Sequence, residues 1–294
     1  MLNPEFIKKI NESVYSKPRT IQEIALLLNV NWRTADNYVE KIAKELGTLS
    51  VRTFREGTRG ALKIVFWNNI ERMHVSEAQE RLFRLIESGR KKEDFSPSEI
   101  FQYVDTKARR LKILNMAEYG LEENFNDFAN LLKSAKSQIL FFSGNMTFSN
   151  REAHDIKIQN ILEDLAKQKI TSKVLTRVEL AGLKNVQNAL AINQRIGWNA
   201  LEIRHCFQPL RATIIDGDVA VFKEILDPKD FAEGELKEKT YLLYYIYDPD
   251  WISWLQKVFW HLFRPAVDAK TRITMLEPFK SPQFCNKGAV ITQT

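Results

Sequence analysis

The chain has 294 residues, of which 44% are hydrophobic, a length sufficient for two or three domains and a composition unlike that of a disordered protein. The 43 Lys and Arg residues exceed the 37 Asp and Glu residues, so the chain is mildly basic, with a formal net charge of +6, and is not a polycation. Cys206 and Cys285 form no CxxC motif and no apolar run approaches the roughly 20 residues of a membrane span, so a disulfide scaffold, a cysteine-rich zinc site and a membrane-spanning protein are not predicted.

The first two predicted helices cover residues 2–15 and 20–28. Pro18 separates them, because proline cannot continue a helix. Thr20 and Glu23 have the spacing of a capping box at the start of the second one. Apolar residues recur in that helix at the spacing of one face, namely at Ile21, Ile24, Leu27 and Leu28.

A further helix is predicted after a short turn at Asn29 and Val30. Gly47 suits its C-terminal end. Its inward positions are Ala35, Tyr38, Val39, Ile42 and Leu46. Polar and basic residues remain on the outer face near its start, as in a helix that reads base edges and phosphates. These candidate DNA contacts are Asn31, which can also cap the helix, Trp32, Arg33, Thr34, Asn37 and Lys41.

A two-stranded hairpin is predicted next, with strands at residues 49–54 and 61–67. Gly57 and Gly60 lie between the strands and mark the turn. A loop of this kind that carries arginines can reach a phosphate backbone or a minor groove. The candidate DNA contacts of this hairpin are Arg52, Arg55, Thr58, Arg59 and Lys63.

Helix, turn, helix and hairpin occur in the order and at the lengths of a winged helix-turn-helix, which residues 1–69 resemble. The family implies binding of double-stranded DNA, although such folds also serve as protein-docking modules. DNA is favoured because the outward residues and the hairpin tip are basic and polar together. Residues 1–70 hold eleven basic and seven acidic residues, so +4 of the net charge lies there.

Residues 70–126 are predicted to form a helical linker or dimerisation segment. Helices are expected over 76–88, from 96 onward and over 107–120. The last of these carries four basic residues that either contact phosphate or, as we favour, belong to a solvated connector; they are Lys107, Arg109, Arg110 and Lys112. Helices placed in this way often pair two copies of a regulator, so a homodimer is expected.

Residues 127–267 alternate between helical and strand patterns, which predicts an α/β domain with a mixed sheet. A buried strand is expected at 138–143, and Asp216-Gly217 marks the turn of a hairpin. The other strands are expected at 170–176, 201–207, 210–216, 219–225 and 241–247, with an amphipathic helix over 251–262. The remaining segment, 268–294, is predicted to be a weakly ordered tail.

The run PLRATIIDGDVAVFKE at 209–224 resembles the catalytic motif of the phospholipase D family, H-x-K-x-x-x-x-D followed by glycine. Asp216 and Gly217 match the end of that motif, while Arg211 stands in place of the lysine and Pro209 in place of the histidine. Proline cannot attack phosphorus, and no second copy of the motif is found. His205 lacks a cation two residues later. The chain therefore resembles TrmB-type transcription regulators, in which a winged helix precedes a degenerate phospholipase-D-like domain.

This resemblance implies a protein that is not an enzyme, whose C-terminal domain serves dimerisation or senses an effector. Arg211 and Asp216 are the candidate effector pocket for a small anion, with the alternative that they simply pair with each other. No cofactor and no metal are predicted, because His74, His154, His205 and His261 lie at no metal-ligand spacing. No other catalytic motif is found.

The expected protein is thus multidomain: an α+β winged helix, a helical linker and an α/β phospholipase-D-like domain. We expect a sequence-specific transcription regulator that binds double-stranded DNA. It is placed in the cytoplasm, since the N-terminus lacks the pattern of a signal peptide. The alternatives are a nuclease or phosphodiesterase with a shifted site, and a winged helix that docks protein.

Overall fold

The computed structural model describes residues 3–16, 18–55, 61–67, 77–153, 156–232 and 235–280. The chain divides into two compact units, Met1–Val75 and Ser76–Thr294, called unit 1 and unit 2 below. The finer division into four segments stays a prediction.

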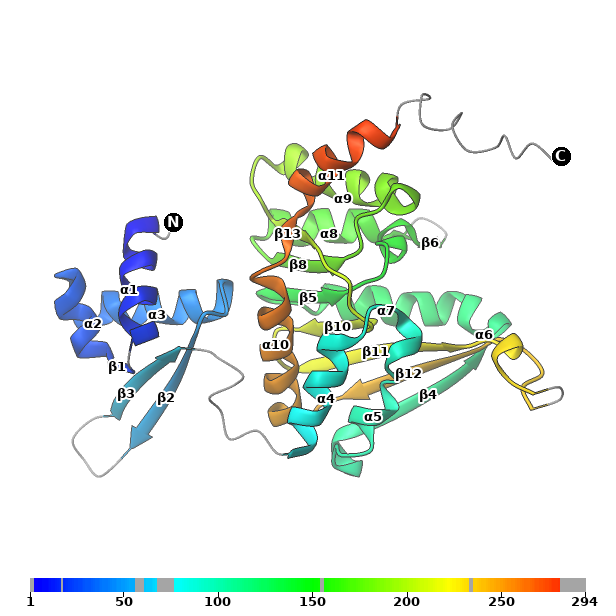
Figure 1. Ribbon diagram of the computed structural model, residues 1–294, viewed down its shortest axis with the longest axis horizontal. Coiled ribbons are helices and arrows are strands. Elements are labelled where there is room, and N and C mark those ends of the chain that lie inside the picture. Colours follow the sequence, from blue (N-terminus) through cyan, green and yellow to red (C-terminus); the bar gives the residue numbers. More distant parts are fainter. Residues whose placement is uncertain are drawn as a thin grey trace, which may run out of the picture. The chain divides into compact units, whose positions relative to one another are not determined.

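The described residues of unit 1 form three helices and three strands, which are labelled in Figure 1. In chain order they are α1 (Pro4–Ser16), β1 (Arg19–Thr20), α2 (Ile21–Leu28), α3 (Trp32–Glu45), β2 (Leu49–Arg55) and β3 (Ala61–Trp67). The strands form an antiparallel sheet in the order β1-β3-β2. Strand β1 was not predicted, and the other elements begin and end within two or three residues of their predicted bounds.

The core of unit 1 lies where the three helices meet the sheet. Each helix contributes the apolar positions that recur along one of its faces, and β3 contributes Val65. The side chains of this core with at most 1% exposure are Ile10, Val14, Ile21, Ile24, Ala35, Val39, Ile42 and Val65. The polar face of α3 is left outside the core as a result.

Unit 2 is an α/β unit built on one sheet. Its longer helices are α4 (Glu77–Ser88), α7 (Glu122–Lys133), α8 (Ile158–Lys167), α9 (Leu183–Ile196), α10 (Pro249–Phe263) and α11 (Ala269–Leu276), and its short ones are α5 (Ser98–Phe101) and α6 (Met116–Gly120). The strands are β4 (Arg109–Asn115), β5 (Gln138–Phe142), β8 (Thr171–Thr176), β9 (Leu201–His205), β10 (Ala212–Ile215), β11 (Val219–Leu226), β12 (Thr240–Ile246) and β13 (Val267–Asp268), with β6 (Glu152–Ala153) and β7 (Ile156–Lys157) forming a separate small ribbon.

The main sheet of unit 2 has eight strands in the order β13-β9-β8-β5-β10-β11-β12-β4. Strands β5, β8 and β9 are parallel, and all the other pairs are antiparallel. The sheet is therefore mixed, as the sequence predicted. Strand β5 lies at its centre and is buried along its whole length, which explains its continuous apolar run.

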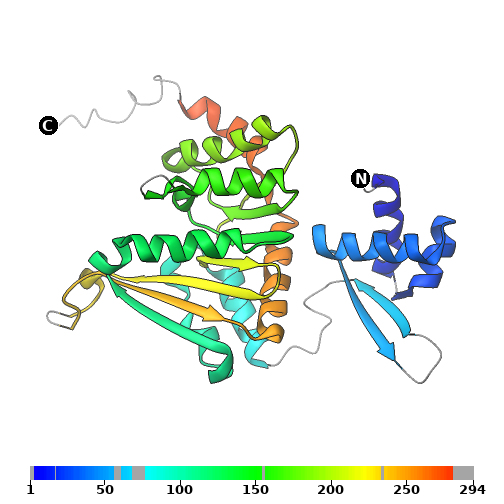
Figure 2. The same cartoon turned by 180° about the vertical axis from the view of Figure 1, so that it is seen from behind.

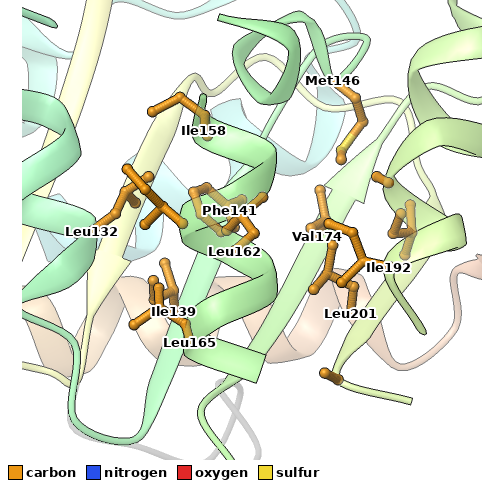
Figure 3. Close-up of a cluster of buried hydrophobic side chains, with 14 of the residues drawn as sticks. Leu132, Ile139, Phe141, Met146, Ile158, Leu162, Leu165, Val174, Ile192 and Leu201 are labelled. Carbon is orange, nitrogen blue, oxygen red and sulfur yellow. The ribbon is translucent and has the colours of Figure 1, made fainter. Parts of the chain in front are cut away.

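Helices cover both faces of this sheet (Figures 1 and 2). On one face α7, α8 and α9 bury a large apolar cluster against β5, β8 and β9. Figure 3 shows part of it, including Leu132, Phe141, Leu162 and Val174. On the other face α10 contributes aromatic side chains, with the ring of Phe259 packed edge-on 5.2 Å from that of Phe142.

The helix predicted over 107–120 is wrong for most of its length. Arg109–Asn115 form strand β4, which pairs with β12 along all seven of its residues, and only Met116–Gly120 are helical. Its alternation of charged residues with Leu111 and Ile113 has the period of a strand. Pairing with a strand far along the chain decides the outcome over local helix propensity.

The segment after residue 268 is more ordered than predicted as far as Lys280. Helix α11 buries Ala269 and Leu276 in the same cluster as α9. Asp268 caps it by accepting hydrogen bonds from the backbone N–H groups of Lys270 and Thr271, at 2.8 and 3.4 Å. Residues 281–294 lie outside the described part of the chain.

Candidate functional site

The start of helix α3 is held by its own residues and by α2. Thr20 and Glu23 form the predicted capping box of α2, with N–O distances of 2.7 and 3.1 Å. Asn29 then adopts a left-handed conformation, with φ of 53°, and turns the chain towards α3. Asn31 caps α3 by accepting a hydrogen bond of 2.8 Å from the Thr34 N–H. The cap and the buried side of α3 together fix which residues of this helix reach solvent.

The outer face of α3 presents the predicted polar and basic side chains. Arg33, Asn37 and Lys41 are exposed and lie four residues apart, so they project from the same side of the helix. Trp32 is exposed next to them, while Thr34 is half-buried. In the described residues Arg33 and Lys41 pair with no carboxylate. The positive end of the helix dipole lies at the same place.

Lys63 differs from these cations because its ammonium is already engaged. It lies 2.8 Å from the Asp36 carboxylate and 3.2 Å from that of Glu40, both on α3. The hydrogen bond to Asp36 raises the pKa of Lys63 above its ordinary value. Lys63 therefore links β3 to α3, and we remove it from the set of DNA contacts that the sequence predicted.

The remaining hairpin candidates are only partly described. Arg52 and Arg55 belong to β2 by their backbone, and their side chains lie outside the described part. Thr58 and Arg59 lie between the described strands, in residues that the structure does not describe.

In unit 2, Asp216 stands at the turn between β10 and β11. Asp216 and Gly217 have φ angles of 53° and 89°, the left-handed pair that the Asp-Gly sequence predicts. The Asp216 carboxylate accepts four hydrogen bonds of 2.6 to 2.8 Å, from the N–H groups of Lys136, Ser137 and Gln138 and from the Ser137 hydroxyl. Burial raises the pKa of Asp216, but these hydrogen bonds outweigh it, so the pKa lies below its ordinary value.

Arg211 stands at the opposite end of β10, roughly 16 Å away at about 3.3 Å per residue. Its Nη1 donates to the carbonyls of Leu210, at 2.6 Å, and Gln208, at 3.4 Å. Its guanidinium lies so close to Gly144 that a Cβ there would stand 2.7 Å from Nη2. Burial lowers the pKa of Arg211 to about 10, and the neighbouring Arg177 adds to that effect.

The predicted association of Arg211 with Asp216 is therefore wrong. The motif residues occupy opposite ends of one strand, where Asp216 organises a turn and only Arg211 lies at a cavity. The spacing of five residues along a strand separates the two side chains, and this distance follows from the strand assignment alone.

The cavity beside Arg211 has a volume of about 520 Å³. It lies between α7 and the face of the sheet formed by β5, β10, β11 and β12, and it includes Ser143 and Gly144 at the carboxyl end of β5. Ligands of open α/β sheets commonly bind at the carboxyl ends of parallel strands. Its apolar wall comes from Phe128, Leu131, Phe141, Phe148, Val221, Leu243 and Tyr245.

Three further polar residues of the lining were not singled out in the sequence: Tyr119, Arg151 and Lys223. They belong to α6, to the segment before β6 and to β11, and no motif joins them in sequence. Lys223 alone had a signal, since it follows the Asp-Gly turn on the second strand of the predicted hairpin.

His205 ends β9 and has a structural partner. Its Nδ1 accepts a hydrogen bond of 2.9 Å from the Val178 N–H. Burial lowers the pKa of His205 below its ordinary value. In the described residues, no group of three or more His, Cys, Asp and Glu side chains could hold a metal ion.

No protein-family model and no curated protein matches the sequence. Among solved structures, the chain is similar to TrmBL2, an archaeal chromatin protein reported to show a novel mode of DNA binding, at 15% identity and a TM-score of 0.38 over 90% of this chain and 94% of that one. It is also similar to Nuc from Salmonella typhimurium, a phospholipase D family member, at 12% identity and a TM-score of 0.38 over 54% of this chain and 97% of that one. A third similarity, to phosphatidylserine synthase of Haemophilus influenzae Rd KW20, has 10% identity and a TM-score of 0.36 over 60% of this chain and 47% of that one.

These similar structures include a TrmB-like protein and phospholipase-D-type proteins, the two groups that the sequence resemblance named. They contradict the expectation that the chain is not an enzyme, because a phospholipase D family member and phosphatidylserine synthase are among them. That expectation is corrected and forms no part of the function proposed below. Within the described residues, no helix has the length and hydropathy needed to cross a bilayer.

Proposed function

We propose that the protein is a transcription regulator that binds double-stranded DNA in a sequence-specific manner through unit 1. In this proposal unit 1 is a winged helix-turn-helix with α3 as its recognition helix and the β2–β3 hairpin as its wing. The observation that carries the proposal is the exposed face of α3 with Arg33, Asn37 and Lys41, since arginine and asparagine side chains are suited to base edges. Arg55 and Arg59 at the wing are proposed to meet phosphate.

The test is fluorescence anisotropy with the full chain, a duplex selected by the wild type from a random library, and a scrambled duplex. Arg33→Ala should weaken binding to the selected duplex by about 1–3 kcal/mol, or roughly 5- to 150-fold, and reduce its preference over the scrambled one. Lys8→Ala, which removes an exposed cation of α1, is the matched control and should change affinity by less than about twofold.

Equal weakening on both duplexes would assign Arg33 to phosphate and not to a base. An Arg33→Ala protein with unchanged affinity would exclude α3 as the reading helix. No duplex binding by the wild type at any salt concentration would favour a protein-docking role for unit 1.

Homodimerisation through unit 2 is a further part of the proposal. Strand β4 is at one edge of the eight-stranded sheet, and its Leu111 and Ile113 are 41% and 61% exposed. An edge strand with exposed apolar side chains is suited to pairing with a second copy. Light scattering coupled to size-exclusion chromatography should give the mass of two chains, and Ile113→Lys should lower it to one.

The regulator is proposed to act in the cytoplasm. The cavity at Arg211 is proposed as the binding site of a small anionic effector. A guanidinium is planar and stays charged at pH 7 even with its pKa lowered to about 10. An effector bound there should alter the affinity of unit 1 for DNA, and comparison of anisotropy titrations with and without it measures that coupling.

A further inference from the structure

Two cations in the cavity lie within hydrogen-bond distance of the same tyrosine hydroxyl. The Lys223 ammonium lies 2.8 Å from the hydroxyl of Tyr119, and Nη1 of Arg151 lies 3.1 Å from the same atom. Both cations also lie against the Tyr119 ring, at 4.5 and 4.9 Å from its centroid. The Tyr119 ring is held in place by stacking on Tyr241, with centroids 4.0 Å apart.

The hydroxyl oxygen of Tyr119 accepts hydrogen bonds from both cations. A phenol oxygen has acceptor lone pairs and one O–H donor, and in the described part of the chain that donor has no acceptor. The guanidinium of Arg151 and the ammonium of Lys223 also retain unused N–H donors. Three donors, two of them charged, are thus directed to the same corner of the cavity.

The carboxylates of the lining do not neutralise these two cations. Glu93 pairs with Lys92 at 3.5 Å, and Asp127 pairs at 2.9 Å with Lys112, which lies on β4. Glu224 accepts a 2.6 Å hydrogen bond from a tyrosine hydroxyl, and Asp230 is exposed. Two like charges brought together in a half-buried site repel each other. An anion bound between them would replace that repulsion with attraction to both cations.

Arg211 adds to the positive potential of this corner, but its guanidinium is less available to an anion than Lys223 and Arg151. It lies beside Lys223 on the neighbouring strand, where the Lys223 N–H donates to the Arg211 carbonyl at 2.8 Å. Its guanidinium, however, folds back onto the carbonyls of residues 208 and 210 and packs on Gly144. Lys223 and Arg151 have no such carbonyl partners among the hydrogen bonds of the described residues.

The rest of the cavity is apolar and aromatic. Phe128 and Leu131 from α7 face Val221 and Tyr245 from the sheet, and Phe148 stacks on Phe141 with centroids 4.6 Å apart. A volume of about 520 Å³ is typical of a site for a small organic molecule. The site therefore combines one acid-binding corner with walls suited to a ring or a hydrocarbon chain.

We propose that this cavity binds an organic anion of metabolite size, with its acidic group at Lys223, Arg151 and the Tyr119 hydroxyl and its apolar body between α7 and the sheet. This inference rests on the effector pocket of the proposed function and moves its anion-binding centre from Arg211 to the Lys223–Arg151 pair. The shared chemistry is an acidic group on an apolar body, and either a carboxylate or a phosphate ester supplies it.

The test uses 8-anilinonaphthalene-1-sulfonate, an anion with an aromatic body, and N-phenyl-1-naphthylamine, which has the same body without the sulfonate. Fluorescence titration of the full chain should show one saturable site for the anion. Replacing both cations, by Lys223→Gln with Arg151→Gln, should weaken binding of the anion at least about tenfold, since each removes a charge-assisted contact. Affinity for the neutral probe should stay within about twofold.

Arg195→Gln is the matched control, because it removes an exposed cation of α9 that pairs with Glu163 outside the cavity. It should leave both affinities within about twofold. Tyr119→Phe keeps the ring stack on Tyr241 and removes only the hydroxyl, so it provides a milder variant if the double one does not fold. Tyr119→Phe should weaken binding of the anionic probe roughly three- to tenfold. Competition of 1-naphthyl phosphate and 1-naphthoate with the bound anion then identifies the preferred acid.

An equal loss of affinity for both probes in the double variant, or unchanged affinity for the anion, would overturn the inference. Binding that survives in the double variant and disappears in Arg211→Gln would also overturn it, while leaving an effector pocket centred on Arg211. Absence of a saturable site for either probe in the wild type would overturn both this inference and the proposed effector pocket. The DNA titrations above are independent of all these outcomes.

Discussion

The two ends of strand β10 carry the two charged residues of one sequence motif, and they differ in how fully their partners are supplied. Asp216, at the turn, receives four hydrogen bonds from residues 136–138, whereas Arg211, at the cavity, donates among the described residues only to carbonyls of its own segment. Unit 1 repeats the contrast: Lys63 is bound by two carboxylates, and Arg33 is exposed without one among the described residues. A charge satisfied within the chain stabilises the fold, and a charge with donors left over is available to a ligand.

The largest effect on stability is expected at Asp216, the end of β10 whose charge is fully hydrogen-bonded. Asp216→Asn should lower the free energy of unfolding by about 2–4 kcal/mol, because an amide accepts fewer of these bonds and turns its own N–H₂ towards the donors. Urea denaturation measures it. Asp218→Asn, on the exposed side of the same turn, should change stability by less than about 0.5 kcal/mol, and equal losses in the two variants would contradict the role given to Asp216.

The same carboxylate predicts a pH dependence. Because the pKa of Asp216 is lowered in the folded state, its stabilising contribution is complete above the unfolded pKa of about 3.9 and is lost as pH falls below that value towards the folded pKa. Below pH 4 the wild type should therefore lose stability more steeply than Asp216→Asn. Unfolding curves at pH 7, 4 and 3 check this, and parallel losses in both proteins would assign the acid sensitivity to other groups.

An intermediate effect is expected at the cavity end. A methyl group added by Gly144→Ala would stand 2.7 to 2.9 Å from three atoms of the Arg211 guanidinium, which must move. The expected cost is about 1–2 kcal/mol of unfolding free energy. In an Arg211→Ala background the same change should cost less than about 0.5 kcal/mol, and a double-mutant cycle that is additive would show that the contact is not the cause.

The smallest effect sharpens the contrast in unit 1. Lys63→Met should lower stability by about 0.5 kcal/mol, since a partly exposed ion pair contributes little, and should change DNA affinity by less than about twofold. A loss of DNA affinity as large as that expected for Arg33→Ala would return Lys63 to the DNA-contacting set. Anisotropy titration and urea denaturation of the one variant give both numbers.

Local patterns predicted the parts of the fold that local chemistry decides. Three such features are each found where they were expected: the capping box at Thr20 and Glu23, the Asp-Gly turn at residue 216 and the buried run of β5. Each of them is determined by a stretch of only a few residues. Strand β4 was missed because its partner, β12, lies more than a hundred residues later, and nothing in 109–115 encodes that partner.

The cavity could be predicted only in part, for the same reason. Arg211 was singled out by its place in a motif, but the close approach of Gly144 depends on two strands meeting across the sheet. The convergence of Lys223 and Arg151 on Tyr119 joins three elements that share no spacing in sequence. Such a cluster is visible only once the chain is folded.

The pairing of β4 with β12 has a consequence for synthesis on the ribosome. Residues 109–115 leave the ribosome well before residues 240–246, and at about 5–20 residues per second the delay is on the order of ten seconds. Until then the strand that will close one edge of the sheet has no partner, and Leu111 and Ile113 are presented to whatever binds apolar segments of nascent chains. Strand β4, the first strand of unit 2 in the chain, therefore pairs only after most of that unit has been synthesised.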